Sequence, residues 1–218
     1  FTGWDRVEGG GRANVGIQYT AQFNQGGFVK TLFGQSYQLF GLNSFAAPSL
    51  TNTGIESGLD TARSDYVAGL SYQPNKIYTF SSRFRFDHDT FETQRMELEA
   101  RANFDRWSVS LLYGDYSPQP DIGFLYRRQG ILGTGTLKLD SNWILTGGAR
   151  YDLYAQAFNQ TQIGIGYIDD CMILGLNYIT GYTYDTATGA PTLDHQIMLQ
   201  LTLRTLGGTT VGQHVSGF

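Results

Sequence analysis

Apolar and polar residues alternate with a period of two along most of the chain, a pattern typical of β-strands with one apolar face. The segment from Gly11 to Phe23 shows this most clearly. One face of this segment carries Ala13, Val15, Ile17, Tyr19, Ala21 and Phe23. The other face carries Arg12, Asn14, Gly16, Gln18, Thr20 and Gln22. We therefore predict a strand whose two faces meet different surroundings.

The same alternation predicts eleven strands and an all-β, antiparallel fold. The predicted ranges are 11–23, 27–40, 64–74, 77–89, 92–104, 107–117, 128–139, 143–156, 160–168, 172–184 and 195–206. The second is the least regular, because Gln35 interrupts its apolar face. Most ranges hold about 10 residues or more, which is enough to cross a bilayer at a tilt. We expect one continuous region over residues 1–218.

The connections between the predicted strands differ in length. Short turns are expected at 24–26, 74–76, 105–106, 140–142 and 169–171. Longer connections are expected at 41–63, 117–127 and 185–194, with shorter ones near Thr90 and Phe158. Outer-membrane barrels have short periplasmic turns and longer outer loops. This alternation predicts a bacterial outer-membrane barrel with its short turns, Cys171 and the C-terminus on the periplasmic side.

Composition supports this interpretation. The chain has 28 Gly, 14 Tyr and 14 Phe, and it has no uninterrupted apolar run of the ~20 residues that a membrane helix needs. A net charge of -4 argues against nucleic-acid binding. The chain begins at Phe1 and carries no signal peptide, so we expect a fragment or a processed piece.

Other fold classes stay open at this point: a soluble β-sandwich or lipocalin-like barrel, a general porin-like channel, and a structural or adhesive barrel. The membrane barrel is favoured because eleven long strands offer more apolar surface than one small barrel interior can hold. Aromatic residues also gather at the predicted strand ends, as in interfacial girdles. Bacterial single-chain barrels have even strand numbers, so eleven implies a missed strand or a fragment, and we favour the fragment.

Several short motifs resemble the LptD (OstA/Imp) family of lipopolysaccharide-assembly outer-membrane proteins, in the order in which that family has them. They are Trp4-Asp5-Arg6-Val7-Glu8, Arg12-Ala13-Asn14, Phe33-Gly34-Gln35-Ser36-Tyr37, Ser57-Gly58-Leu59-Asp60, Ser64-Asp65-Tyr66, Asp169-Asp170-Cys171, Leu174-Gly175-Leu176-Asn177-Tyr178 and Leu203-Arg204-Thr205-Leu206-Gly207-Gly208. The resemblance spans essentially the whole chain. It implies the last eleven strands of a 26-stranded barrel that follows a periplasmic jellyroll domain.

The resemblance also implies a function and partners. Members of this family insert lipopolysaccharide into the outer leaflet through a lateral opening between the first and last strands. An LptE-type lipoprotein plugs the lumen, and periplasmic bridge proteins supply the lipopolysaccharide. The strand at 195–206 would then be one lip of the opening. Its candidate gate residues are Gln196, Met198, Gln200, Thr202 and Arg204.

The single cysteine, Cys171, excludes an internal disulfide bond. In the resembled family, cysteines near the C-terminus form disulfide bonds with the periplasmic domain, so the resemblance implies such a bond for Cys171. Many members carry two adjacent cysteines here, whereas this chain has Asp170 beside Cys171. We therefore expect one bond, to a cysteine outside this chain. A buried or stray thiol is the simpler alternative.

Charged residues recur on the polar faces of the fourth and fifth predicted strands, and we expect them to face the lumen. They are Arg83, Arg85, Arg95, Glu97, Glu99 and Arg101. A cross-strand ion-pair ladder is the favoured interpretation. The alternative is a polar path for sugar and phosphate groups, or a contact with the plug protein.

Nothing in the sequence indicates catalysis or a cofactor. The histidines, His88, His195 and His214, accompany no nucleophile motif. The acidic pairs of the chain lack the spacing of a Ca²⁺ loop. We expect no catalytic residue, no metal site, no nucleotide site and no cofactor.

Overall fold

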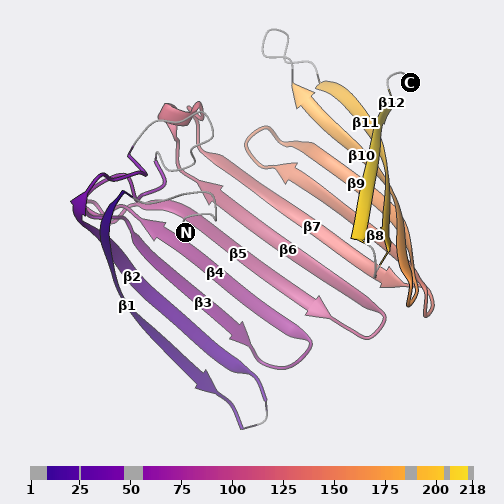
Figure 1. Cartoon of the computed structure of the whole chain (residues 1–218), viewed down its shortest axis with the longest axis horizontal. Helices are drawn as coiled ribbons and strands as arrows, with labels where there is room; N and C mark the ends of the chain where they lie inside the picture. Colours follow the sequence, from indigo (N-terminus) through magenta and orange to yellow (C-terminus); the bar gives the residue numbers. More distant parts are fainter. Residues whose placement is uncertain (1–8, 25, 47–55, 185–190, 204–206, 216–218) are drawn as a thin grey trace. The chain divides into compact units, whose positions relative to one another are not determined.

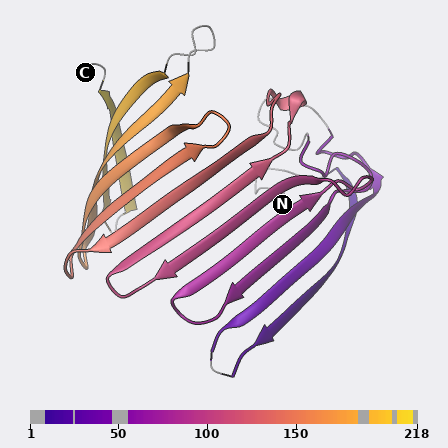
Figure 2. The same ribbon diagram turned by 180° about the vertical axis from the view of Figure 1, so that it is seen from behind.

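The computed structural model describes residues 9–24, 26–46, 56–184, 191–203 and 207–215. These residues form an all-β fold of antiparallel strands, and hydrogen-bonded neighbours follow the chain order from β1 to β12 (Figures 1 and 2). The strands are β1 (Gly10–Gln22), β2 (Phe28–Gly41), β3 (Tyr66–Gln73), β4 (Tyr78–Phe86), β5 (Thr93–Asn103), β6 (Trp107–Tyr116), β7 (Arg128–Lys138), β8 (Trp143–Asp152), β9 (Ala157–Ile168), β10 (Met172–Tyr184), β11 (Pro191–Leu203) and β12 (Gly207–Val215). A 3-10 turn, η1 (Pro120–Ile122), lies between β6 and β7. No helix among the described residues is long and apolar enough to cross a membrane.

Each of the eleven predicted strands corresponds to one of β1 to β11, which confirms the period-two interpretation. The boundary between β8 and β9 was predicted wrongly. The expected connection near Phe158 lies at residues 153–156 instead, and Phe158 belongs to β9. The cause is local: Asp152 Oδ1 accepts hydrogen bonds from the backbone N–H groups of Tyr154 (2.8 Å) and Ala155 (2.9 Å). Such an aspartate turn competes with continued strand pairing.

The twelfth strand, β12, was not predicted. Its residues, GGTTVGQHV, include three glycines and only two valines, so an apolar alternation is hard to see. It pairs antiparallel with β11 from Leu203–Gly207 to His195–Val215. A missed strand therefore accounts for the odd predicted count, which no longer argues for a fragment.

This strand also corrects the predicted position of the C-terminal end. β12 starts beside Leu203, which pairs with Met172 next to the Cys171 turn. It ends at Val215, opposite His195. The end of β12 and the short turn at Cys171 therefore lie at opposite ends of their strands. The prediction that both lie on one side is wrong.

The chain divides into two compact units, and the division interrupts β5 and β6. Unit 1 comprises Phe1–Glu99 and Gly114–Arg128. It contains β1 to β4, paired in sequence, and the three connections that follow β2, β4 and β6. Unit 2 comprises Ala100–Tyr113 and Gln129–Phe218, including the ladder from β7 to β12.

Burial is inverted relative to a water-soluble fold. Among the described residues, Phe45 is the sole buried hydrophobic side chain. The buried polar residues are Gln35, Ser36, Ser64, Asp65, Glu97, Asp115 and Thr180. Large apolar side chains on the strands are exposed, as at Ile17, which is 76% exposed. Strands with one exposed apolar face and one polar face are typical of barrels that contact lipid.

Candidate functional site

Three connections meet at one end of unit 1 and form what we call the loop cluster: residues 56–65, 87–92 and 117–127. Strand β2 anchors the first of them. Gln35 Nε2 donates to the Ser64 carbonyl (2.7 Å), and the Ser36 N–H donates to Ser64 Oγ (2.8 Å). The polar residue that interrupts the apolar face of β2 is thus the residue that fixes the loop. In the sequence, Gln35 appears only as an irregularity in the apolar alternation, although its position marks this site.

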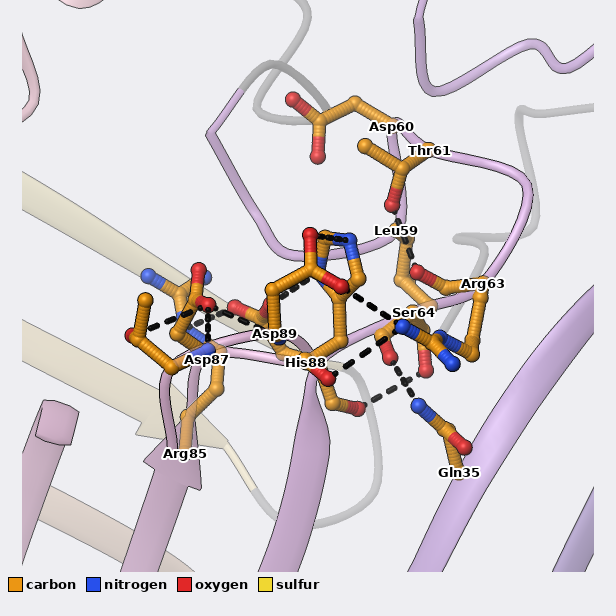
Figure 3. A network of polar contacts seen from close by, with 12 residues as sticks. Gln35, Leu59, Asp60, Thr61, Arg63, Ser64, Arg85, Asp87, His88 and Asp89 are labelled. Carbon is orange, nitrogen blue, oxygen red and sulfur yellow. Dashed lines mark hydrogen bonds and ion pairs between the residues drawn. The ribbon is translucent and has the colours of Figure 1, made fainter. Parts of the chain in front are cut away.

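An ionic network lies between the first two connections of the loop cluster (Figure 3). Asp65 Oδ2 lies 3.3 Å from Arg85 Nε, and Asp65 Oδ1 lies 3.3 Å from His88 Nδ1. These three side chains are only 11%, 15% and 19% exposed. The other ring nitrogen, His88 Nε2, lies 3.2 Å from Asp89 Oδ2, and Arg63 donates to Asp89 at 2.7 Å. The network joins the β2–β3 connection to the end of β4 and to the turn after it.

The electrostatics of the network differ between its carboxylates. Burial raises the pKa of the Asp65 carboxyl, and the His88 hydrogen bond and the Arg85 charge oppose that shift. The pKa of Asp87 is lowered, because its carboxylate accepts hydrogen bonds from the backbone N–H groups of Thr90 (2.8 Å) and Asp89 (2.9 Å). The surroundings therefore disfavour the charged form of Asp65 and favour the charged form of Asp87.

Glu56 connects the first and third segments of the loop cluster to the end of β4. Its carbonyl accepts hydrogen bonds from Arg85 Nη1 (2.9 Å) and Gln119 Nε2 (3.2 Å), and its carboxylate accepts one from the Asp121 N–H (3.4 Å). Burial raises the pKa of the Glu56 carboxyl. Glu56 has a φ of 55°, a left-handed conformation that is uncommon for residues other than glycine. The surrounding contacts stabilise this conformation, as is usual for strained residues in functional regions.

The third segment is held by two arginines. Arg127 makes a bidentate ion pair with the buried Asp115, at 2.7 and 2.8 Å. The guanidinium of Arg128 lies 3.5 Å from the ring centre of Phe124 and donates to Gln119 Oε1 at 2.6 Å. These contacts fix the connection after β6 against the strand ends of the same unit.

Donor atoms of Asp65, Asp87 and His88 lie within 4.8 Å of one another, a spacing that a metal ion could use. The donors already have other partners, however. Asp65 uses its two oxygens for Arg85 and His88, and both ring nitrogens of His88 face carboxylates. A nearby guanidinium also disfavours a bound cation. We therefore interpret the arrangement as a charge network.

The predicted polar ladder is only partly assembled in unit 1. Buried Glu97 accepts hydrogen bonds from Arg83 (3.4 Å), Arg95 (2.6 Å) and the Tyr116 hydroxyl (2.6 Å). Glu99 accepts one from Ser81 (3.4 Å).

Arg85, by contrast, points into the loop cluster, where it pairs with Asp65. Arg101 belongs to unit 2. Whether the ladder faces a lumen stays a prediction.

The predicted gate residues lie on β11, which is not the last strand. β11 pairs with β10 on one side and with β12 on the other. Gln196, Met198, Gln200 and Thr202 alternate with apolar residues along it, and Arg204 lies outside the described residues. The premise that this strand forms an outer lip is therefore corrected, because β12 follows it.

Cys171 lies in the turn between β9 and β10 and is exposed. Its backbone N–H donates to Asp169 Oδ1 (2.7 Å), which fixes the turn. The chain has no second cysteine, so no disulfide bond can form within it. A bond to a cysteine elsewhere stays a prediction.

Comparisons with known proteins identify relatives. The family model described as LptD, LPS transport system D, matches residues 1–123, more than half of the chain. An LPS-assembly protein LptD from Aliivibrio fischeri is 26% identical over 153 residues, covering 66% of this chain and 19% of that protein. The chain thus spans less than a fifth of the length of that curated relative. Among solved structures, Salmonella typhi OmpF in complex with daunomycin has a TM-score of 0.49 and 8% identity, over 100% of this chain and 86% of that one.

The family match confirms two sequence-based predictions. The motif resemblance spreads along the chain, and the matched region includes the segments around Phe33 and Ser57 that carry part of it. The match is also to a transport system, the class of function that the motif resemblance implies. This chain belongs to the LptD family of outer-membrane β-barrel transport proteins.

Proposed function

We propose that this chain forms part of an outer-membrane barrel that delivers lipopolysaccharide to the outer leaflet. The observation that carries the proposal is the match of the LptD family model to residues 1–123. The inverted burial supports it, because a lipid-facing apolar surface and a polar opposite surface suit an amphipathic cargo.

The two strand faces of unit 1 have separate roles in this proposal. The exposed apolar face contacts hydrocarbon chains. On the polar face, Arg83 and Arg95 share Glu97 yet remain 69% and 51% exposed. Two guanidiniums around one carboxylate leave an excess positive charge, which suits phosphate groups on a passing saccharide.

The route for the lipid moiety is a lateral opening between the first and last strands of the longer barrel. β12, not β11, is then the strand nearest that opening within this chain, since it ends the strand order. An LptE-type lipoprotein inside the barrel and periplasmic bridge proteins are the proposed partners. The short turns face the periplasm, and the loop cluster faces the cell exterior.

Depletion of the protein in the bacterium that carries it tests the proposal. Surface lipopolysaccharide, measured with an impermeant antibody or lectin, is expected to fall while total lipopolysaccharide persists inside the cell. Re-expression of the full-length protein is expected to restore surface display. Unchanged surface display during depletion, together with solute conductance by the purified protein in planar bilayers, would point to a porin-like channel instead.

A further inference from the structure

An apolar groove crosses β6, β7, β8 and β9 within unit 2. Gly135 of β7 and Gly147 of β8 are opposite each other in the strand register and form its floor. Val109 of β6 and Ile163 of β9 border the groove on its two sides, and Ile163 is 56% exposed. The volume of the groove is about 530 Å³, within the roughly 300–1,000 Å³ that ligand pockets enclose. The groove is therefore large enough for a ligand.

The groove belongs to the apolar face of the sheet. Gly135 and Leu137 of β7, like Leu145 and Gly147 of β8, are two residues apart and so share one face. The polar residues that border the groove occupy the positions between, so their side chains point to the opposite face; they are Ser108, Thr136, Thr146 and Gln162. A ligand in this groove therefore meets mainly carbon.

The two glycines of the floor leave space that a larger side chain could occupy. Neither has a positive φ, so the backbone conformation does not require glycine. A Cβ would find its nearest neighbour at 3.7 Å at Gly135 and at 3.8 Å at Gly147, which are ordinary contact distances. At Gly34 of β2, in contrast, a Cβ would lie 2.9 Å from the Val15 carbonyl oxygen. Glycine weakens a strand interior and often marks a place where a ligand approaches closely.

The surroundings of the groove define the chemistry of its occupant. The exposed apolar surface continues on both sides, with Leu111 at 54% and Ile165 at 40% exposure. In an outer-membrane barrel this face contacts hydrocarbon. Within hydrocarbon, apolar groups associate through van der Waals packing, because the solvent is itself apolar. An unfilled groove loses such contacts, and a flexible acyl chain that lies along it recovers them.

The position of the groove along the strands favours one class of lipid. Trp107 is the first residue of β6, and Leu137 is the last but one of β7, so the groove reaches the end of the sheet with the short turns. The orientation proposed above places these turns in the periplasm. The neighbouring leaflet is then the one opposite to that which receives lipopolysaccharide. Its lipids are phospholipids.

We propose that this groove is a binding site for one acyl chain of a membrane phospholipid. The chain lies over Gly135 and Gly147, between Val109 and Ile163. The groove itself does not depend on which molecule the barrel transports. The choice of phospholipid over lipopolysaccharide, however, rests on the proposed function and its orientation.

Photolabelling of the full-length protein in phosphatidylethanolamine vesicles tests the site. The probe is a phosphatidylethanolamine with a diazirine in one acyl chain, and peptide mass spectrometry locates the adducts. Labelling of residues 107–111 and 135–147 should exceed that of residues 13–21 at least about fivefold, the preference that on the order of ten carbon–carbon contacts provides. Ordinary bilayer contact would label β1 at least as strongly, because Ile17 is 76% exposed. Equal labelling of the two regions would overturn the proposal.

Variants of the floor make the test specific. Gly135→Leu fills the groove and should reduce its labelling to the level of β1. Gly175→Leu is the matched control: a Cβ there also has open space, with its nearest neighbour at 3.8 Å, but Gly175 alternates with the apolar residues of β10. This control should label as the wild type. Full labelling of the groove in Gly135→Leu would contradict the site.

Two further arms complete the experiment. Should Gly135→Leu fail to fold, as judged by its β-sheet circular dichroism, the double variant Gly135→Ala and Gly147→Ala narrows the groove with Cβ atoms that fit, and should lower its labelling at least about twofold. If added lipopolysaccharide removes the label and an equal amount of unlabelled phosphatidylethanolamine does not, the phospholipid assignment is wrong. Neither arm measures surface display of lipopolysaccharide, so a failure here is distinct from a failure of the proposed function.

Discussion

Gln35 of β2 donates a hydrogen bond of 2.7 Å to the carbonyl of Ser64. This bond links the middle of β2 to the connection that precedes β3. Both residues are buried, at 8% and 3% exposure. A buried carbonyl that loses its donor costs about 1–3 kcal/mol.

Gln35→Leu is therefore expected to destabilise the loop cluster, although it would restore the apolar alternation of β2. The free energy of opening, measured by hydrogen exchange of residues 57–66, should fall by about 1–3 kcal/mol. Gln38→Leu is the matched control, since the half-buried Gln38 side chain donates to the carbonyl of the nearby Phe40 and to no group of the loop cluster. A loss of protection with Gln38→Leu as large as with Gln35→Leu would contradict this role.

Gly58 is expected to be required for two reasons: it adopts a left-handed backbone conformation, and the site has no room for a Cβ atom. Its φ is 80°, and a Cβ at this position would meet the Asp65 carboxylate. Gly58→Ala should cost more than the roughly 1–2 kcal/mol of a left-handed alanine, because Asp65 must also move away from Arg85.

Gly26→Ala separates the two effects. Gly26 has a φ of 86° and no neighbouring atom within 4 Å of a Cβ, so only the conformational cost applies. Chemical denaturation of the two variants should show the larger loss for Gly58→Ala. Equal losses would mean that the contact with Asp65 is unimportant.

The β4–β5 turn is expected to weaken in acid because of Asp87. The lowered pKa of Asp87 means that its charged form stabilises the fold above its unfolded pKa of about 3.9, and that this contribution is lost as the pH falls through the lower folded value. Asp65 has the opposite sign, since its raised pKa favours the fold as the pH falls toward that value. Protection of residues 87–92 should therefore decline below about pH 4 in the wild type.

Asp87→Asn removes this acid dependence while keeping an oxygen acceptor for the Thr90 N–H. The variant should lose hydrogen-exchange protection in the turn at neutral pH, and its protection should change less than that of the wild type below pH 4. Hydrogen exchange of the peptide covering residues 87–92 checks the result. If protection in the variant falls below pH 4 as much as in the wild type, another carboxylate causes the effect.

Cys171 reports the side of the membrane that the short turns face. Its exposed thiol should react with an impermeant maleimide only after the outer membrane is permeabilised. If it forms the predicted disulfide bond, labelling should also require a reductant. Leu125→Cys in a Cys171→Ser background is the matched control in the β6–β7 connection, where Leu125 is 64% exposed, and it should react in intact cells. The reverse pattern would invert the proposed orientation.

The period-two alternation predicted β1 to β11, because successive side chains of a strand point to opposite faces, and an apolar face therefore appears as every second residue. It missed β12, where glycine and threonine replace large apolar residues. It also could not reveal the loop cluster, since Gln35, Asp65 and His88 come from separate segments and meet only after the strands pair. Asp65 and His88 appear in the sequence as ordinary polar loop residues, and only the fold shows that His88 Nδ1 lies 3.3 Å from Asp65 Oδ1.

Photo-crosslinking at the polar face tests the central claim of lipopolysaccharide transport most directly. A photoreactive residue replaces Arg83 in the full-length protein, and a second variant carries it at Phe80, an exposed residue of the alternate face of the same strand. We expect lipopolysaccharide adducts at position 83 that disappear once lipopolysaccharide synthesis is blocked, and mainly phospholipid adducts at position 80. No lipopolysaccharide adduct at position 83 during active synthesis, in a protein that folds and reaches the outer membrane, would contradict the proposed path.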